Sequence, residues 1–446
     1  MKLDYSRSLP GLLGWWPLGF RRFRMECPRK QHIAYIMWHF PLLSETFVQR
    51  EITALKDKGI NISIIADGIP DTALLDNASR ALAAATTTVL PLDRVEMRGV
   101  LRRFLKRHPL RTANLLLFLL FHRYHERKTR RFDMHVFNKS VYIAGLCERL
   151  GVTHVHSPWA DLNAITGLLA SRLLGVPFSV QARAHDIHRK TYLHGLKEKF
   201  AYAELVITNT NYNASRLKAI VGAGSTGKIV RIYNGIPLHA FPYRTPAEIR
   251  GRPVRILTVA RLIEQKGIDD LLRACSGLRR AGIDFQATVV GGPEEDREVD
   301  SEAIRRQCRD LGLDSHVGFA GNRSQREVLE HYRLADMFVL PSKIAEDGSR
   351  DVIPNVLIEA MAVGLPCIST RLTGIPEIID DGVDGLLVAP GAVEALIEAM
   401  TELSRNHDLR RTLSANARSK VESRFDIDRN AEEYRAVFNA IGRYAP

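Results

Sequence analysis

Two carboxylates and a proline form the most informative group in the sequence. Asp351 and Glu359 are separated by seven residues, and Pro354 lies between them. Proline fits the first turn of a helix, where its missing N–H costs nothing. Asp351 then lies just before the helix, and Glu359 lies on its second turn. Because free N–H groups at a helix N-terminus bind phosphate, this arrangement can hold a sugar hydroxyl and a phosphate in one small volume.

Two cations provide the other half of this predicted site. Arg261 and Lys266 follow an apolar segment that ends near Val259, and a helical pattern begins after Gly267. Cations at the carboxyl end of a strand are typical of anion binding by an α/β sheet. Together with the carboxylates they predict a nucleotide-sugar site. The alternative, a surface helix with solvated charges, is disfavoured because both groups fall at loop-to-helix junctions of one repeating pattern.

The elements that must position these residues follow a β/α rhythm in two series. The first predicts strands at 33–40, 60–66, 154–157, 177–182, 205–208 and 229–233, with helices at 44–58, 161–174 and 213–221. The second predicts strands at 254–260, 285–290, 317–320, 337–340, 366–369 and 386–388, with helices at 268–281, 303–311, 325–334, 355–363 and 393–400. Such alternation predicts an α/β fold, with two doubly wound Rossmann-like domains that face each other across a cleft.

The same pattern divides the chain into five segments. Residues 1–30 are basic and aromatic without a clear period, and they indicate an N-terminal arm. We expect a first Rossmann-like domain at 31–237, a linker at 238–253, a second Rossmann-like domain at 254–425 and a C-terminal helix at 426–446. A chain of 446 residues is long enough to bury two such cores.

The composition favours anionic partners and a reducing compartment. The chain has 63 Lys and Arg against 50 Asp and Glu, a net charge of +13, which suits phosphates or an acidic membrane surface. Its 5 scattered cysteines form no C-x-x-C pair, which argues against structural zinc. No apolar stretch reaches the roughly 18 residues of a spanning helix, and no signal-peptide pattern is present. We expect a cytoplasmic protein that does not bind nucleic acid, because no RNA- or DNA-reading motif appears.

One region interrupts the β/α rhythm. Residues 98–109 are basic with apolar residues at helical spacing, residues 113–121 are apolar, and residues 122–131 are basic again. Cationic flanks around an apolar face are typical of an amphipathic element on an anionic leaflet. The alternative is a helical hairpin packed on its own sheet with a solvated basic face. The two are compatible, because the apolar run can be core while only the flanks contact lipid.

Two further patterns do not indicate sites. Gly222, Gly224 and Gly227 match G-x-G-x-x-G, but a phosphate loop follows a strand and opens a helix, and here that order is reversed. His188 and His194, with His185, lack the spacing and the carboxylate partner of a zinc site. We therefore expect no metal.

An ordered series of motifs runs through both halves. In the second half it comprises 259–262 (Val-Ala-Arg-Leu), 290–293 (Val-Gly-Gly-Pro), 339–342 (Val-Leu-Pro-Ser), 359–362 (Glu-Ala-Met-Ala) and 374–377 (Gly-Ile-Pro-Glu). In the first half it comprises 40–47 (Phe-Pro-Leu-Leu-Ser-Glu-Thr-Phe), 154–156 (His-Val-His) and 184–187 (Ala-His-Asp-Ile). The series resembles the retaining glycosyltransferases of the GT-B fold, known as glycosyltransferase family 4. Its first half resembles the branch that acts in bacterial exopolysaccharide and colanic-acid-type assembly.

This resemblance implies an enzyme that moves a sugar from a nucleoside diphosphate sugar to a hydroxyl with retention of configuration. Arg261 and Lys266 would stabilise the departing diphosphate, so that no metal or other cofactor is required. Glu359 would hold the ribose hydroxyls, and Asp351 would orient the donor sugar. Further donor-binding residues implied in the same half are Gly291, Pro354 and Asn355.

The resemblance also implies acceptor-side residues and a partner. His185 corresponds to the active-site histidine that contacts the donor sugar, and Ser44 and Glu45 lie at the acceptor side of the cleft. The implied acceptor is a lipid-linked saccharide, which places the enzyme on the inner face of the plasma membrane. Other functions compatible with parts of the sequence are a GT-B sugar-nucleotide epimerase, a non-catalytic membrane-adsorbed scaffold and an NAD-type oxidoreductase, although the last lacks a correctly placed glycine motif.

The chain departs from the family pattern at two places. Asp351 occupies the position where the family's commoner form has glutamate. Its shorter side chain reaches a sugar hydroxyl if the loop 346–350 moves inward, and Glu346 or Asp347 could share the role. The usual glycine-rich first loop is replaced by residues 41–44, Pro-Leu-Leu-Ser.

Overall fold

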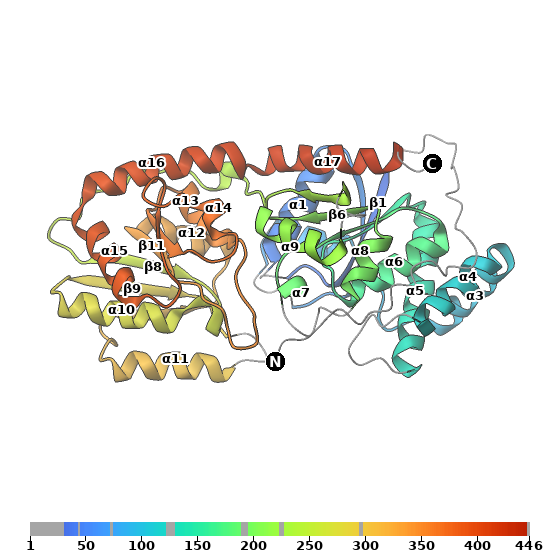
Figure 1. The fold of residues 1–446 in the computed structure, drawn as a ribbon, viewed down its shortest axis with the longest axis horizontal. Coiled ribbons are helices and arrows are strands. Elements are labelled where there is room, and N and C mark those ends of the chain that lie inside the picture. The colour runs from blue at the N-terminus through green and yellow to red at the C-terminus, as the bar shows by residue number, and fades with distance from the viewer. Residues whose placement is uncertain are drawn as a thin grey trace.

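The computed structural model describes residues 31–42, 45–71, 75–121, 130–188, 195–222, 227–293 and 298–443. Within them the chain forms two parallel β-sheets flanked by helices, one in each half of an elongated molecule (Figure 1). This confirms the α/β fold class with two Rossmann-like sheets. The predicted N-terminal arm at 1–30 and the basic residues 122–129 lie outside the described residues.

The first sheet, as far as the chain is described, has seven parallel strands in the order β3-β2-β1-β4-β5-β6-β7. The strand order reverses between β1 and β4, and ligands bind outside the carboxyl ends of strands at such a switch point. The strands are β1 (His32–His39), β2 (Asn61–Gly68), β3 (Thr86–Thr88), β4 (His154–Ser157), β5 (Phe178–Gln181), β6 (Leu205–Thr208) and β7 (Ile229–Arg231).

The second sheet has six parallel strands among the described residues, in the order β10-β9-β8-β11-β12-β13. Its switch point lies between β8 and β11, which pair from Met337 opposite Ile256. The strands are β8 (Val254–Val259), β9 (Phe285–Val290), β10 (Val317–Gly321), β11 (Met337–Leu340), β12 (Cys367–Thr370) and β13 (Leu386–Val388).

Helices connect successive strands in both halves. Those of the first half are α1 (Thr46–Asp57), α2 (Asn77–Ala84), α3 (Arg94–Arg107), α4 (Pro109–Phe121), α5 (Arg130–Leu150), α6 (Leu162–Leu174), α7 (His185–His188), α8 (Leu196–Tyr202) and α9 (Asn211–Val221). A short 3-10 helix, Leu238–Ala240, lies between the halves. Those of the second half are α10 (Ile268–Arg280), α11 (Glu298–Asp310), α12 (Gln325–Leu334), α13 (Asn355–Ala362), α14 (Ile375–Ile378), α15 (Val393–Arg405) and α16 (His407–Arg424).

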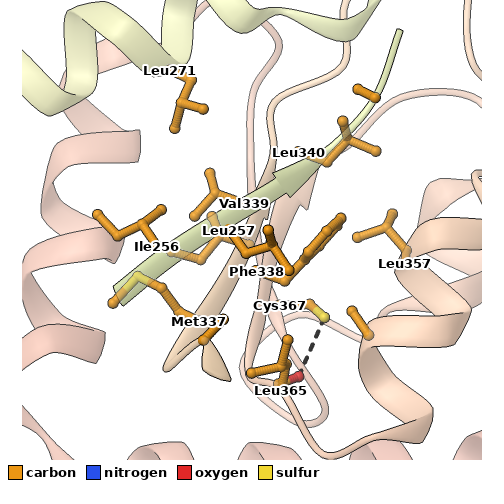
Figure 2. Packing of buried hydrophobic residues seen from close by; sticks show 14 of the residues in the cluster. Ile256, Leu257, Leu271, Met337, Phe338, Val339, Leu340, Leu357, Leu365 and Cys367 are labelled. Atoms are coloured by element: carbon orange, nitrogen blue, oxygen red, sulfur yellow. Dashed lines mark hydrogen bonds between the residues drawn. The ribbon is translucent and has the colours of Figure 1, made fainter. Parts of the chain in front are cut away.

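The core of the second half holds α13 against its sheet. Figure 2 shows Leu357 of α13 directed toward Phe338 of β11, with Ile256 and Leu257 of β8 on the other side. Phe338 and Leu357 are both fully buried. Burying such side chains stabilises the fold by about 1.5–3 kcal/mol each. The helix that carries Glu359 is therefore fixed by apolar packing to the central strands of its sheet.

The chain crosses between the halves twice. After α16 it turns at Phe425, whose carbonyl oxygen accepts from the Ile236 N–H over 2.8 Å. The last described helix, α17 (Ile427–Arg443), then returns to the first half, where it lies against α1. Figure 1 shows α16 and α17 running end to end along the two halves. Phe438 of α17 packs on the rings of His154 and His156 in β4, which makes this helix part of the first core.

Several elements were not predicted from the sequence. The edge strand β3 consists of three threonines and contains no apolar residues, because a strand at an exposed edge need not be apolar. The helix α16 buries only Leu413, Ala417 and Val421 among its apolar side chains, so its many charges hide the helical period. The helix α11 begins at Glu298, five residues before the expected start at 303, in a polar stretch of the same kind.

Candidate active site

The loop after β8 brings Arg261 and Lys266 to the carboxyl edge of the second sheet. A 3-10 turn at Glu264–Lys266 leads from the strand into α10. Gly267 has a φ of +64°, and a Cβ there would lie 1.9 Å from the Pro341 carbonyl oxygen. Since only glycine allows this approach, the loop lies directly against the end of β11. Both cations lie at a strand end, as the sequence predicted.

Lys266 and Asp351 form an ion pair between the loops that follow β8 and β11. The Lys266 Nζ–Asp351 Oδ1 distance is 2.5 Å, and the two side chains are 13% and 10% exposed. The Ser342 hydroxyl donates to the other oxygen, Oδ2, over 2.6 Å. A carboxylate offers about four lone-pair sites. The fixed Asp351 carboxylate therefore keeps acceptor capacity for a ligand hydroxyl.

The backbone at Asp351 is held by a residue in an unusual conformation. Thr373 has a φ of +50°, a region that costs a residue other than glycine about 1–3 kcal/mol. Its hydroxyl donates to the Asp351 carbonyl oxygen over 2.5 Å. Loops that follow β8, β11 and β12 thus converge on one residue, Asp351. Nothing in the sequence marks Thr373, because its φ depends on the surrounding loops.

Gly291 allows the loop after β9 to approach the same site. Its φ is +133°, and a Cβ there would lie 2.0 Å from the Ala260 carbonyl oxygen, next to Arg261. Its N–H donates to the Gly321 carbonyl oxygen over 2.9 Å. A side chain at this position would push the loop away from Arg261, so the glycine keeps the cation in place.

The N-terminus of α13 lies just after Asp351. Pro354 is the N-cap and Asn355 is the first helical residue, so the proline precedes the first turn in which it was expected. The Asn355 Oδ1 accepts from Asn234 Nδ2 of the first half over 3.0 Å. One turn further, Glu359 is 8% exposed. Its Oε2 accepts from the Tyr332 hydroxyl over 3.2 Å, and its Oε1 lies 2.8 Å from Arg50 Nη1.

Glu45 approaches this group of residues from the first half. It is the N-cap residue of α1 and is partly buried. Burial raises the pKa of Glu45 to about 7, while a hydrogen bond with Trp159 and the charges of Arg183 and Arg261 oppose the rise. Arg261 of the second half is thus among the charges that lower the pKa of this carboxyl. Ser44, the other predicted acceptor-side residue, lies outside the described residues.

His185 is the first residue of α7, directly after the loop that follows β5. Its neighbour Asp186 is fully buried and organises that loop. The Asp186 Oδ1 accepts from the Ala184 N–H over 2.7 Å, and Oδ2 accepts from the Ala160 N–H over 3.0 Å. The loops after β4 and β5 are therefore joined at the carboxyl edge of the first sheet.

A further contact joins the halves at the motif 374–377. Glu377 Oε2 accepts from the Asn211 N–H over 2.8 Å, and Oε1 accepts from the Tyr212 N–H over 2.9 Å. The Tyr233 hydroxyl also donates to Oε2 over 2.9 Å. A carboxylate of the second half thus caps the N-terminus of α9 in the first half, where the helix dipole favours negative charge.

Sequence reasoning missed four residues of this region. Arg50 follows Thr46 by four residues on the same helix, a spacing that places it beside the predicted acceptor-side residues. Ser342 belonged to a recognised motif but received no role. Glu377 likewise belonged to the recognised motif 374–377 but received no role, because its partners lie in the first half. Tyr332 carried no signal of its own, because its partner Glu359 is distant in sequence.

The comparisons with known proteins agree with this geometry. Residues 242–420 match the family model described as Glycosyl transferases group 1. The chain is 29% identical over 408 residues to the glycosyltransferase WcaL of Salmonella typhimurium, a protein named for colanic acid biosynthesis, covering 88% of this chain and 96% of WcaL. It is 28% identical over 419 residues to the amylovoran biosynthesis glycosyltransferase AmsK of Erwinia amylovora, covering 88% of this chain and 96% of AmsK.

Solved structures agree on the fold. A glycosyltransferase from Rickettsia africae superposes with a TM-score of 0.68 at 17% identity, covering 93% of this chain and 99% of that one. Anabaena HepE in complex with UDP-glucose superposes with a TM-score of 0.67 at 16% identity, covering 92% of this chain and 99% of that one. Over residues 242–420 the chain is therefore similar to the glycosyl transferases of group 1, and it has the GT-B architecture of two parallel Rossmann-like sheets.

Proposed function

We propose that this glycosyltransferase moves a sugar from a nucleoside diphosphate sugar to a hydroxyl of a lipid-linked saccharide, in the synthesis of a bacterial exopolysaccharide or related cell-surface glycan. One observation carries the proposal. Arg261, Lys266, Asp351 and the N-terminus of α13 converge at the switch point of the second sheet. The names of WcaL and AmsK support an exopolysaccharide product, and the UDP-glucose complex of HepE supports a nucleotide-sugar donor.

The cations would act on the leaving group. As the anomeric bond breaks, the diphosphate gains negative charge, and preorganised positive groups aimed at that charge lower the barrier most. Arg261 and Lys266 supply two such groups, and the dipole and N–H groups of α13 supply a third. These groups can take the place of a metal ion, so the reaction as proposed needs no cofactor.

The carboxylates would hold the neutral parts of the donor. Asp351 is fixed by Lys266 and Ser342, and it would accept a hydrogen bond from a hydroxyl of the donor sugar. Glu359 would accept from the ribose hydroxyls. His185 begins α7 at the carboxyl edge of the first sheet, a position compatible with contact to the donor sugar.

Retention of configuration would follow if the acceptor attacks from the face that the diphosphate leaves. A departing phosphate oxygen then takes the proton of the acceptor hydroxyl, and the sugar–oxygen bond forms as the sugar–phosphate bond breaks. Glu45 lies at the start of α1, where it can orient that hydroxyl. The electrostatic effect of Arg261 on Glu45 supports a position close to the diphosphate.

A membrane surface is the partner that a lipid-linked acceptor requires. The described residues contain no helix that is long and apolar enough to cross a membrane. The hairpin of α3 and α4 instead presents exposed apolar side chains, with Leu110 64%, Leu120 66% and Phe121 80% exposed. The opposite face of α4 packs inward through Leu115 and Phe118. The apolar run is therefore half core and half surface, which supports peripheral binding at the inner face of the plasma membrane.

The basic side of this hairpin differs in part from the sequence-based interpretation. Arg103 and Arg107 lie 3.1 and 3.4 Å from Glu148 of α5, so their charges are partly compensated. The exposed residues that remain to face an anionic surface on α3 are Arg94, Arg98, Arg102 and Lys106. Figure 1 shows α3 and α4 at the end of the first half that is farthest from the second sheet.

A panel of UDP- and GDP-sugars, scored by thermal unfolding and by product formation, tests the proposed function. A true donor at 100 times its Kd stabilises the fold by roughly 2.7 kcal/mol. The transferase proposal requires a product only when a saccharide acceptor is present. A changed sugar nucleotide without acceptor would identify an epimerase instead, and binding without any turnover of the whole panel would favour a non-catalytic scaffold.

A further inference from the structure

Arg50 of the first half reaches the donor helix of the second half. Its Nη1 lies 2.8 Å from Glu359 Oε1, and the side chains are only 11% and 10% exposed. The guanidinium also lies over the ring of Phe241, 5.5 Å from the ring centroid. Phe241 is buried in the segment that joins the halves. Arg50 is thus enclosed by residues of the second half and of the connection, although it belongs to α1.

The Glu359 carboxylate is held at both oxygens but retains capacity. Oε1 faces Arg50, and Oε2 accepts from the Tyr332 hydroxyl over 3.2 Å. Of about four lone-pair sites on a carboxylate, two remain for a diol. Within the described part of the chain, the buried Nη1 of Arg50 makes no aligned hydrogen bond, and it lies 2.8 Å from Glu359 Oε1, so its charge acts on this carboxylate.

The position of Arg50 is set by the core of the first half. The next residue, Glu51, is 4% exposed and accepts from the Tyr35 hydroxyl over 2.9 Å and from Arg183 Nη2 over 2.5 Å. Arg183 Nη1 donates to Asn234 Oδ1 over 3.1 Å, and Asn234 in turn donates to Asn355 at the start of α13. Two sets of contacts therefore connect α1 with α13. One runs from Glu51 by hydrogen bonds to the first residue of α13, and the other is the ion pair of Arg50 with Glu359 on its second turn.

We propose that Arg50 is a positioning residue for the donor: from the acceptor-side half, it orients and charge-compensates the carboxylate that binds the donor ribose. The inference rests on the proposed function, because it assigns Glu359 to the ribose. It adds that nucleoside recognition depends on a residue of the opposite half. The helix α1, whose N-cap residue is Glu45 at the acceptor side, also carries Arg50, which contacts the ribose-binding carboxylate. Binding of the donor ribose then depends on the same Arg50–Glu359 contact that joins the two halves.

A general role of Arg50 in holding the halves together makes a different prediction. Loss of such a role would weaken binding of every ligand in the cleft to a similar degree. A positioning role affects only the nucleoside, because the diphosphate contacts its own groups, Arg261 and Lys266. Inorganic pyrophosphate contains the phosphates without the ribose. Comparing it with UDP and GDP therefore separates the two roles.

The test compares Arg50→Met with Lys58→Met in the full chain. Methionine keeps an unbranched apolar stem like that of arginine but removes its charge. Lys58 lies at the end of the same helix and pairs with Glu432 of α17 over 3.1 Å, so its variant loses an ion pair of α1 away from α13. Isothermal titration measures binding of UDP, GDP and inorganic pyrophosphate. We expect Arg50→Met to bind the nucleoside diphosphate that the parent binds about tenfold more weakly or worse. Pyrophosphate binding should stay unchanged, and Lys58→Met should match the parent with every ligand.

A double-mutant cycle with Glu359→Gln adds a second readout. The compared quantity is the change in log Kd for the nucleotide that Arg50→Met causes. If Arg50 acts through Glu359, this change in the Glu359→Gln background should be less than half of the change in the parent. Additive losses would overturn the inference. Equal losses for UDP or GDP and for pyrophosphate would overturn it as well, in favour of a general contact between the halves.

The controls keep the result interpretable. If Arg50→Met does not fold, Arg50→Lys keeps the charge but not the fork, and the same comparison of nucleoside diphosphate with pyrophosphate applies to it. If the parent binds neither UDP nor GDP and forms no product with the donor panel, the proposed function fails and the inference fails with it. If the parent is active and Arg50→Met binds its nucleoside diphosphate normally, only the inference fails.

Discussion

Arg261 and Lys266 both follow β8, at the carboxyl edge of the second sheet. Lys266 is paired with Asp351 at 2.5 Å, and both side chains are largely buried. Removing one member of a buried ion pair leaves the other charge buried without its partner, which strongly destabilises the fold. The two cations should therefore affect turnover alike, and loss of Lys266 should also affect folding.

Replacing either cation with alanine should lower kcat by on the order of 10²-fold, because each removes one preorganised charge from the leaving group. Lys266→Ala should in addition lower the midpoint of thermal unfolding, since it leaves Asp351 without its cation. Steady-state kinetics and calorimetry measure the two effects. Arg371→Ala is a matched control, because Arg371 forms an exposed ion pair with Asp381. Parental turnover in Arg261→Ala would remove that residue from the site.

Glu45 should make stability depend on pH in an unusual direction. Burial raises the pKa of this carboxyl from 4.5 to about 7. Between these values the folded chain binds a proton that the unfolded chain has released. The contribution of Glu45 to the free energy of unfolding is therefore fully present below about pH 4.5 and is lost as the pH rises through about 7.

Urea unfolding of the parent and of Glu45→Gln measures this dependence. Glutamine stays neutral, so the free energy of unfolding of the parent minus that of the variant should fall between about pH 5 and about pH 7 and then level off. Glu302→Gln, at an exposed position of α11, should leave a difference that does not change with pH in this way. A flat difference for Glu45→Gln over the same range would contradict the buried setting of Glu45.

At the scale of elements, two helices determine what the chain can bind. The helix α13 is fixed to its sheet by buried side chains such as Leu357, and it presents Asn355 and Glu359 to the opposite half. The start of α12 is equally defined, because Ser324 and Glu327 form a capping box that sets where the helix begins. This start places Tyr332 beside Glu359.

The α3–α4 hairpin should bind anionic vesicles through its exposed basic and apolar side chains. Each basic residue near an anionic surface contributes about 1 kcal/mol, so Arg94, Arg98, Arg102 and Lys106 together supply roughly 4 kcal/mol. We expect co-sedimentation with anionic vesicles at low salt and release at high salt, because the Debye length falls from about 10 Å at 0.1 M to about 3 Å at 1 M. Reversing these four charges should abolish binding to vesicles while donor binding stays intact.

The matched control reverses four exposed arginines on α15, α16 and α17, namely Arg405, Arg411, Arg424 and Arg429. It changes the net charge of the chain by the same amount on other helices. This variant should still sediment with vesicles at low salt. Loss of binding in both variants would mean that net charge alone attracts the chain, and no binding by the parent would leave the hairpin as plain surface structure.

At the scale of the whole molecule, the halves are joined by directional contacts as well as by the connecting segments. Glu377 accepts three hydrogen bonds from the first half, two of them from the N–H groups that begin α9. The hydrogen bond Asn234–Asn355 and the ion pair Arg50–Glu359 both join the first half to α13. The relative placement of the halves therefore depends on a few polar groups.

Glu377→Ala should loosen this placement. Loss of a helix cap typically costs about 0.5–2 kcal/mol, and here the cap also joins the halves. We expect a larger radius of gyration by small-angle X-ray scattering, together with a lower kcat. Glu327→Ala is the control, because it removes a cap within the second half only. It should lower stability without expanding the molecule. Equal radii for the parent and Glu377→Ala would show that other contacts hold the halves.

The sequence by itself determined the fold class and most strands, because buried parallel strands are short apolar runs that any chain of this kind must contain. It also determined that Arg261, Lys266 and Asp351 lie at loop-to-helix junctions and that Glu359 lies on the second turn of a helix. These are local properties, read from the periodicity and the turn residues around each position. The edge strand β3 and the polar helix α16 were not predicted, since neither buries enough apolar surface to produce a hydrophobic pattern in the sequence.

Only the tertiary structure decided which of these residues meet. The ion pair of Lys266 with Asp351 joins positions 85 residues apart, and the hydrogen bond of Tyr332 with Glu359 joins positions 27 apart. The sequence predicted two separate roles for Lys266 and Asp351, whereas the structure makes them one unit. It likewise brings Arg50 to Glu359 from the other half of the chain. Such pairs depend on how sheets and helices pack in three dimensions, which periodicity along one chain does not encode.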